Sequence, residues 1–118
     1  MKRLNIAIAM MLVSIVLFTV SAQAGAVSGK LTMLRVHDVG TKYGPETDQI
    51  DVEVVVRLNT TPDWAYGFQL RNDDNRPVRQ AMLDLLRDAF NHNWTVTLEY
   101  NVDPGKKNAV IFRVILKK

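Results

Sequence analysis

The sequence predicts one mainly β domain that contains a single helix and follows an export signal. Three observations support this prediction: an uncharged run after a basic start, several segments in which apolar and polar residues alternate, and one segment, 76–91, with apolar residues every three or four positions. Alternation is typical of strands, and the longer period is typical of an amphipathic helix. The length of 118 residues and the 47% hydrophobic content fit one globular domain.

The first 24 residues have the layout of a secretory signal peptide. A basic start is followed by uncharged residues up to Val20, and Ala22-Gln23-Ala24 then places small residues at a signal-peptidase site. We expect cleavage after Ala24, which makes residues 1–24 the signal and residues 25–118 one domain that is periplasmic or secreted. The alternative is an uncleaved anchor, because 17 uncharged residues reach the lower limit of a membrane-spanning helix.

Charge and cysteine content exclude several classes of protein. Cleavage removes two of the 15 basic residues and none of the 12 acidic ones, so the exported domain has a net charge of +1 with neutral histidines. Nucleic-acid binding depends on clustered Lys and Arg, so no nucleic-acid partner is expected. The chain has no cysteine, which excludes disulfides, thiolate metal sites and a cysteine nucleophile. No cofactor is expected, and no membrane span remains after cleavage.

Alternation predicts three strands in the first part of the domain, at residues 30–37, 50–59 and 64–70. Gly67, inside the third of these, is expected to mark a bulge or a sharp bend. The second strand has the clearest period, and its core face is formed by Ile50, Val52, Val54, Val56 and Leu58. The opposite face, which contains Glu53 and Val55, is expected to be mostly exposed to solvent.

An amphipathic helix is expected over Arg76–Asn91. The polar run Asn72-Asp73-Asp74-Asn75 offers capping side chains before it, and Pro77 is tolerated in a first helical turn. The apolar stripe of this helix consists of Val78, Ala81, Met82, Leu85, Leu86, Ala89 and Phe90. The stripe predicts the side that packs against the strands, and Asn91-His92-Asn93 is expected to end the helix.

Two further strands are expected to form a hairpin. Residues 94–100 and 110–116 alternate, and Asp103-Pro104-Gly105-Lys106 between them is a strong turn signal. The last strand is apolar on both faces at Ile111 and Ile115, so another element or subunit should cover it. The element order is therefore strand, strand, strand, helix, strand, strand. A five-stranded antiparallel barrel with one helix after the third strand has the order of the OB-fold, which is the predicted fold.

Three segments have a resemblance to a known family: Trp64-Ala65-Tyr66-Gly67-Phe68, the helix Arg76–Asn91, and the strand Trp94–Tyr100 with its Leu98-Glu99-Tyr100 end. With the signal peptide and the element order, they resemble the subtilase cytotoxin B-subunit-like family, the B subunits of bacterial one-plus-five toxins. The resemblance implies an OB-fold, a ring of five subunits with helices at its centre, a surface that binds sialylated glycans, and an enzymatic A subunit as partner. The cysteine pair usual in those subunits is lacking here.

The expected function is binding. A domain of this size buries only about 60–68% of the surface that its unfolded chain exposes, so without disulfides it is biased toward self-association. The first hypothesis is an exported non-catalytic binding module, resembling a toxin B subunit, that self-associates and binds glycans on a host or cell surface. The alternative is a monomeric periplasmic OB-fold domain that binds a small ligand or a cell-envelope protein. An enzyme is not expected, because Ser28 is the only serine of residues 25–118 and lies outside any nucleophile motif.

Two groups of residues are candidate sites. Tyr43 is an aromatic residue in a predicted loop, where it can stack on a sugar ring while Asp38 and Lys42 bond the sugar hydroxyls. The second group is the polar side of the helix, which faces the pore if the subunits form a ring with helices inward. It consists of Gln80, Asp84, Arg87 and Asn91, and Asp84 can meet Arg87 of its own or a neighbouring helix.

Other polar and aromatic residues have simpler interpretations. The acidic group is interpreted as a solvated face, and it consists of Asp38, Glu46, Asp48, Asp51 and Glu53. The two histidines, His37 and His92, have no companion spacing motif, so no metal site is expected, and His92 complements the negative end of the helix. The strand aromatics, interpreted as core and barrel end, are Trp64, Tyr66, Trp94 and Tyr100.

Overall fold

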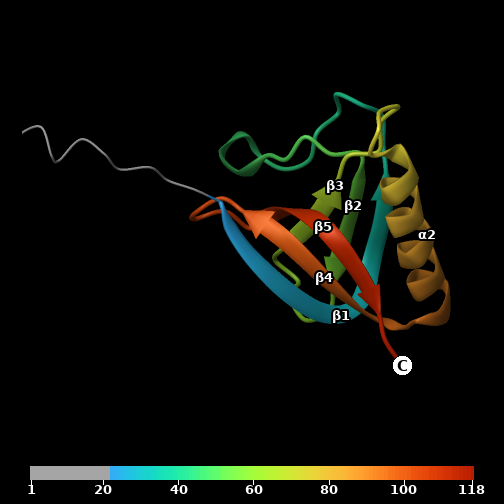
Figure 1. Cartoon of the computed structure of the whole chain (residues 1–118). Coiled ribbons are helices and arrows are strands. Elements are labelled where there is room, and N and C mark those ends of the chain that lie inside the picture. The colour runs from blue at the N-terminus through green and yellow to red at the C-terminus, as the bar shows by residue number, and fades with distance from the viewer. Residues whose placement is uncertain (1–21) are drawn as a thin grey trace, which may run out of the picture.

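The computed structural model describes residues 22–118 and is mainly β with one α-helix (Figure 1). Its elements are β1 (Gln23–Val36), β2 (Val54–Leu58), β3 (Ala65–Phe68), α2 (Arg76–His92), β4 (Thr95–Val102) and β5 (Asn108–Leu116), with a short 3₁₀ turn at Glu46–Asp48. The predicted signal peptide lies outside the described residues up to position 21. Within the described part, no helix is long and apolar enough to span a membrane.

The five strands close into a barrel in the order β1-β2-β3-β5-β4. Four neighbouring pairs are antiparallel, but β3 and β5 are parallel, with Tyr66 opposite Ala109. The expectation of a fully antiparallel barrel is therefore wrong. Directions can alternate around a closed ring only if the number of strands is even, so five strands require at least one parallel neighbour. The helix supplies the connection that brings β4 and β5 back into the barrel.

β1 begins seven residues earlier than the predicted strand. Its first half pairs with β4, from Gln23 opposite Val102 to Lys30 opposite Thr95, and its second half pairs with β2. The segment 24–29 consists of small residues and one valine, so it shows no alternation of large apolar side chains. The small residues have a packing role at Gly25, where a Cβ would lie 2.6 Å from the ring of Tyr100.

The predicted faces of the second strand are only partly correct. Val54, Val56 and Leu58 belong to the main core, but Ile50 and Val52 belong to a smaller second cluster with Val55 and Ala65. The regular strand begins at Val54, so the alternation does not run continuously from Ile50. Val55 and Glu53, expected on the solvated face, are both buried. The fold therefore has two apolar clusters on opposite sides of β2.

Gly67 is explained by close packing. It is buried and pairs with Val55 in an unbroken register between β2 and β3, so the expected bulge or bend is not what fixes this residue. A Cβ at this position would lie 2.6 Å from the side chain of Val52 and 2.7 Å from the backbone oxygen of Val54. Only glycine allows this approach of the chain to β2.

The helix has the predicted position, but its buried side is narrower than the predicted stripe. Met82, Leu86 and Ala89 are buried against the barrel, while Val78 and Phe90 are exposed. Ala81, another residue of the predicted stripe, is exposed as well, and Leu85 is only partly buried. The polar run before the helix makes no side-chain cap; Asp73 instead accepts a hydrogen bond from the backbone N–H of Asn75 at 2.9 Å, within the turn.

The helix ends as predicted. Asn93 adopts the left-handed conformation at φ 57°, and its backbone N–H donates to the carbonyl of Ala89. The backbone N–H of Trp94 donates to the same carbonyl at 3.0 Å, so the chain is fixed where it enters β4. Asparagine is one of the few residues that tolerate this conformation, which explains why the helix stops here.

A bulge changes the faces of β5. Pairing with β4 passes from Glu99–Arg113 to Tyr100–Ile111, so Phe112 is left without a partner position on β4. As a result Ile111 points into the core, while Val110 and Phe112 are both exposed. Ile111 is therefore covered by the core itself, and the residues that need a cover are Val110 and Phe112.

Candidate functional site

The predicted loop site is organised around Tyr43. Its backbone forms an isolated bridge with Ile50, through two hydrogen bonds of 2.9 Å. Its phenolic oxygen accepts hydrogen bonds from Nη2 of Arg57 at 2.8 Å and from Nε at 3.2 Å. The guanidinium of Arg35 lies 5.6 Å from the centre of the ring, within the range of a cation–π contact. Tyr43 is therefore half-buried and fixed between two arginines, instead of standing free in the loop.

The other two predicted loop residues are exposed. Asp38 and Lys42 lie in the same loop as Tyr43, and Lys42 adopts a left-handed backbone conformation at φ 60°. The polar groups that contact the phenol come from Arg57, which also donates to the carbonyl of Pro62 at 2.8 Å. Sequence reasoning missed both arginines, because Arg57 was placed on the solvated face of its strand and no pattern singled out Arg35.

The acidic group is not a uniform solvated face. Glu53 is 2% exposed, and its Oε1 accepts hydrogen bonds from the backbone N–H of Leu70 at 3.0 Å and from Nε of Arg71 at 2.9 Å. Arg71 also reaches Asp51 at 2.8 Å. The hydrogen bond to Glu53 raises the pKa of Arg71, and Asp51 adds to the effect. These residues form a structural ion pair that fixes the end of β3 to β2.

Asp48 is the second acidic residue with a structural role. Its carboxylate accepts from the backbone N–H of Lys107 at 2.9 Å and from that of Asn108 at 3.2 Å. The side chain of Asn108 in turn donates to the backbone oxygen of Asp48 at 2.7 Å. These hydrogen bonds attach the loop before β2 to the start of β5, and the carboxylate of Asp48 is occupied by backbone N–H groups.

The polar side of α2 forms a small network. Gln80 donates to Asp84 at 3.2 Å, and Arg87 lies 3.6 Å from the same carboxylate. The Asp84–Arg87 pair within one helix agrees with the predicted contact. Asn91, the fourth predicted residue, is exposed near the end of the helix. Whether a neighbouring helix faces this surface stays a prediction.

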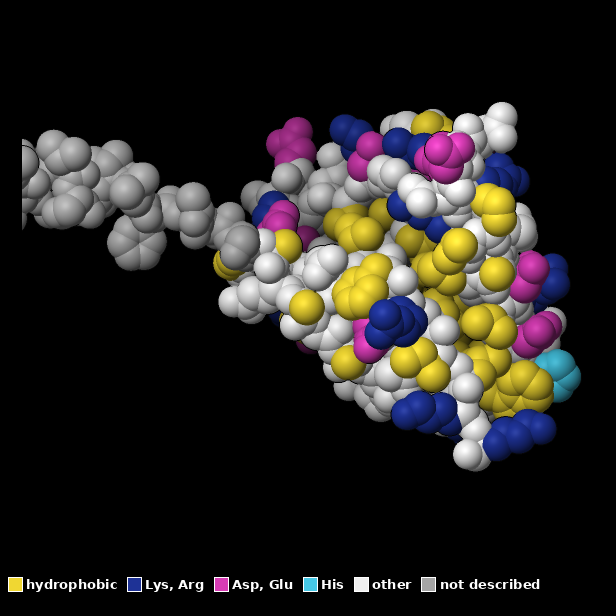
Figure 2. Space-filling view, viewed as in Figure 1, with side chains coloured by type: hydrophobic (Ala, Val, Ile, Leu, Met, Phe, Trp, Pro, Cys, Tyr) yellow, Lys and Arg dark blue, Asp and Glu magenta, His cyan; other side chains and the backbone are white. Residues whose placement is uncertain are grey.

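A groove with apolar walls runs between α2 and β5, and we name it the α2–β5 groove. It has a volume of about 280 Å³ and is lined chiefly by Val78, Arg79 and Met82 of α2 and by Val110, Ile111 and Phe112 of β5. Val78 is 65% exposed, Val110 42% and Phe112 46%. Figure 2 shows hydrophobic side chains gathered along the junction between α2 and the barrel. The exposed apolar residues make this groove a candidate surface for binding another molecule.

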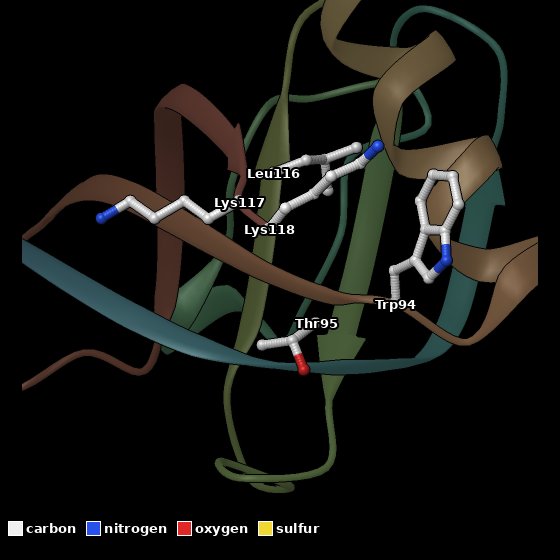
Figure 3. Close-up of a pocket in the computed structure, with 5 residues that line it drawn as sticks. All are labelled: Trp94, Thr95, Leu116, Lys117 and Lys118. Carbon is white, nitrogen blue, oxygen red and sulfur yellow. The ribbon is translucent and has the colours of Figure 1, made fainter.

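A second cavity lies where β4 begins and β5 ends, and we name it the Trp94 pocket. It has a volume of about 470 Å³, and its lining residues, drawn in Figure 3, are Trp94, Thr95, Leu116, Lys117 and Lys118. Trp94 is 48% exposed, so of the two places expected for the strand aromatics, the core and the barrel end, it does not lie in the core. The reason is that β4 starts only at Thr95, which leaves Trp94 in the connection after the helix.

The other strand aromatics agree better with the sequence prediction. Tyr66 is buried, and its ring lies 6.2 Å from that of Trp64 and 5.2 Å from that of Tyr100. Burial raises the pKa of Tyr66, although its hydroxyl lies 3.0 Å from that of Thr61 in a hydrogen bond. Trp64 and Tyr100 are partly buried against the core.

No family model, no curated protein and no solved structure matches this chain. The candidate sites therefore rest on the geometry of the chain itself. Over residues 22–118, no three His, Cys, Asp or Glu side chains gather in a way that could hold a metal ion.

Proposed function

We propose that this chain is an exported, non-catalytic binding module with the OB-fold, and that it self-associates. The observation that supports self-association most strongly is the α2–β5 groove, where Val78, Val110 and Phe112 expose large apolar surfaces side by side. The closed five-stranded barrel, with its helix between β3 and β4, supports the OB-fold assignment. The resemblance to toxin B subunits suggests a ring of five and an enzymatic A subunit as partner.

A second copy of this chain is the occupant that fits the groove best. One edge of β5 pairs with β4, and the other pairs with β3 only from Asn108 to Val110. From Ile111 onward, the edge that faces β3 has no strand partner within the described residues. An unpaired strand edge beside exposed apolar side chains favours contact with another chain. The exported domain has a net charge close to zero, so two copies do not repel each other strongly.

Light scattering on the purified protein tests self-association. We expect the wild type to have a mass that is a multiple of the monomer mass, and Phe112→Asp to shift it toward the monomer. Val39→Asp is the control, because Val39 is also an exposed large apolar residue but lies in the loop after β1. A wild type that stays monomeric at high micromolar concentration would refute self-association. Equal effects of the two substitutions would refute the assignment of the groove.

A non-catalytic role is supported by the position of Ser28. Its hydroxyl lies 2.7 Å from the hydroxyl of Thr97, on an exposed part of the β1–β4 pair. A serine nucleophile needs a neighbouring general base, and a threonine hydroxyl is not one. Ser28 is therefore assigned to the surface of the sheet.

Glycan binding is proposed at the Tyr43 cluster, defined as Arg35, Tyr43 and Arg57. Arg57 is held by its hydrogen bonds to Tyr43 and Pro62. Arg35, in contrast, forms no ion pair with a carboxylate in the described part of the chain and remains available to an acidic sugar. Arg35→Gln is expected to weaken binding of sialyllactose and to leave the assembly mass unchanged. Wild-type protein that shows no saturable binding of sialyllactose would remove the glycan part of the proposal.

Export with cleavage after Ala24 is the remaining part of the proposal. Gly25 packs under the ring of Tyr100 and pairs with it, so a chain that starts at Gly25 keeps this contact. Cleavage there would remove only two paired residues of β1, Gln23 and Ala24. Intact-mass measurement of the exported protein tests this: a chain starting at Gly25 is expected, and retention of residues 1–24 would mean an anchored domain.

The alternative function is a monomeric periplasmic OB-fold domain that binds a small ligand or a cell-envelope protein. The Trp94 pocket favours it, because its volume of about 470 Å³ lies within the usual range for small-molecule sites. The light-scattering experiment separates the two functions. A stable monomer with an occupied pocket would favour the alternative.

A further inference from the structure

We infer that the Trp94 pocket binds an organic carboxylate whose apolar body packs against Trp94 and Leu116 and whose carboxylate contacts Lys118. The inference depends neither on self-association nor on the Tyr43 cluster, because the pocket is formed by the end of β5 and the start of β4 of one chain. It names a ligand class for the pocket that the alternative function above assigns to a small ligand, and it holds whether the chain is a monomer or self-associates.

The sheet register brings the lining residues together. Val96 pairs with Leu116 in the β4–β5 ladder, so the residues just before Val96 lie beside those just after Leu116. Trp94 and Thr95 therefore meet Lys117 and Lys118 although more than 20 positions separate them in the sequence. In Figure 3 the side chain of Lys118 extends toward Trp94, and that of Lys117 extends to the opposite side. Lys118 is thus the cation closest to the apolar wall.

The charge of the lining selects an anion. Two of the five lining residues are lysines, and none of the five has an acidic side chain. Neither lysine takes part in an ion pair within residues 22–118. The α-carboxylate of Lys118, the last residue of the sequence, offsets one of the two lysine charges, so the lining has a net charge of +1. A cationic ligand would meet this net positive charge, while a carboxylate would be attracted to it.

The apolar wall is held in position before any ligand binds. The indole of Trp94 stacks on the imidazole of His92, with ring centres 4.5 Å apart and planes 17° apart. His92 is itself held by the backbone oxygen of Asp88 at 2.8 Å, and since a carbonyl only accepts, Nδ1 is the donor. A preorganised aromatic ring loses little conformational freedom on binding, which favours a compact ligand with a flat body.

The test uses 1-naphthoate as the probe and its neutral carboxamide as the charge control. The chain has two tryptophans, so their indole N–H signals in a ¹H–¹⁵N spectrum report on the pocket and on a reference position. We expect 1-naphthoate to shift the signal of Trp94 with a saturable curve and to leave that of Trp64 in place. The carboxamide should bind about fivefold or more weakly, as expected for the loss of one exposed ionic contact.

Paired lysine substitutions provide the control for position. The double substitution Lys117→Gln and Lys118→Gln should weaken the binding of 1-naphthoate by at least about fivefold. Lys106→Gln combined with Lys107→Gln, in the turn between β4 and β5, makes the same change in net charge and should have no effect. The inference is overturned if Trp94 shows no saturable shift, if naphthoate and carboxamide bind equally, if both tryptophans respond alike, or if the two lysine pairs have the same effect.

Discussion

Replacing Leu86 by alanine tests the packing of α2 on the barrel. Leu86 is fully buried, with 0% exposure, and belongs to the main core between the helix and the strands. Leucine-to-alanine changes at such positions cost about 3–5 kcal/mol, because transfer free energy is lost and a cavity remains. A domain of this size loses about 4–8 °C of melting temperature per kcal/mol, so the melting temperature should fall by roughly 12 °C or more.

Leu85→Ala is the matched control, since Leu85 is the same residue type in the same helix but only partly buried. We expect it to cost about 1–3 kcal/mol. Urea unfolding followed by circular dichroism gives both values, and the slope with denaturant should stay unchanged so that the midpoints report stability. Equal losses for the two variants, or a loss below about 1 kcal/mol for Leu86→Ala, would refute the placement of the buried helix face.

Three further predictions concern β2, β3 and their contacts. Glu53→Gln should lower stability by about 1.5–3 kcal/mol in urea unfolding, because a buried carboxylate with charged hydrogen bonds becomes neutral; an unchanged midpoint would contradict the ion pair. Because the pKa of Tyr66 is raised in the folded state, the unfolded chain loses the phenolic proton at a lower pH than the folded chain does. The contribution of Tyr66 to the free energy of unfolding is therefore complete below about pH 10 and is lost as the pH rises further. Tyr66→Phe should therefore make the fall of stability above pH 10 less steep, and an identical pH profile would contradict the burial. Gly67→Ala should destabilise by about 1–3 kcal/mol because its Cβ would press on Val54, whereas an increase in stability would contradict the close approach of the chain to β2.

The sequence predicted the elements well because their signals are local. The helix at Arg76–His92, its end at Asn93 and the β4–β5 hairpin all follow from short patterns of turn and apolar residues. The early start of β1 had no such signal, since the small residues around Gly25 show no alternation. A glycine is needed at position 25 because a side chain there would clash with the ring of Tyr100, which lies far away in the sequence.

It was harder to predict which face of a strand is buried than to predict where the strand lies in the sequence. One irregular residue moves every later side chain of the strand to the opposite face. The bulge at Phe112 turns Ile111 into the core and leaves Val110 outside. The interruption before Val54 similarly separates Val52 from the alternation that seemed to continue through it. The parallel β3–β5 pair could have been deduced, since five strands cannot alternate around a closed ring.

The candidate sites were predicted only in part, because they depend on residues that the fold brings together. Tyr43 was singled out as a loop aromatic, but its arginine partners come from two different strands. The Trp94 pocket arises from the β4–β5 register, which places Lys118 beside a tryptophan that the sequence assigned to a strand. The buried position of Glu53 depends on Arg71, 18 residues later, and alternation alone assigned it to the solvent.

Amide hydrogen exchange at low and high protein concentration tests the central claim most directly, because it reports both association and the surface involved. Self-association through the α2–β5 groove predicts that protection increases with concentration in α2 around Val78 and in β5 around Val110 and Phe112. The loop around Val39 should exchange at the same rate at both concentrations. Exchange that is independent of concentration over the whole of α2 and β5 would contradict the account, and so would a concentration effect confined to the loop.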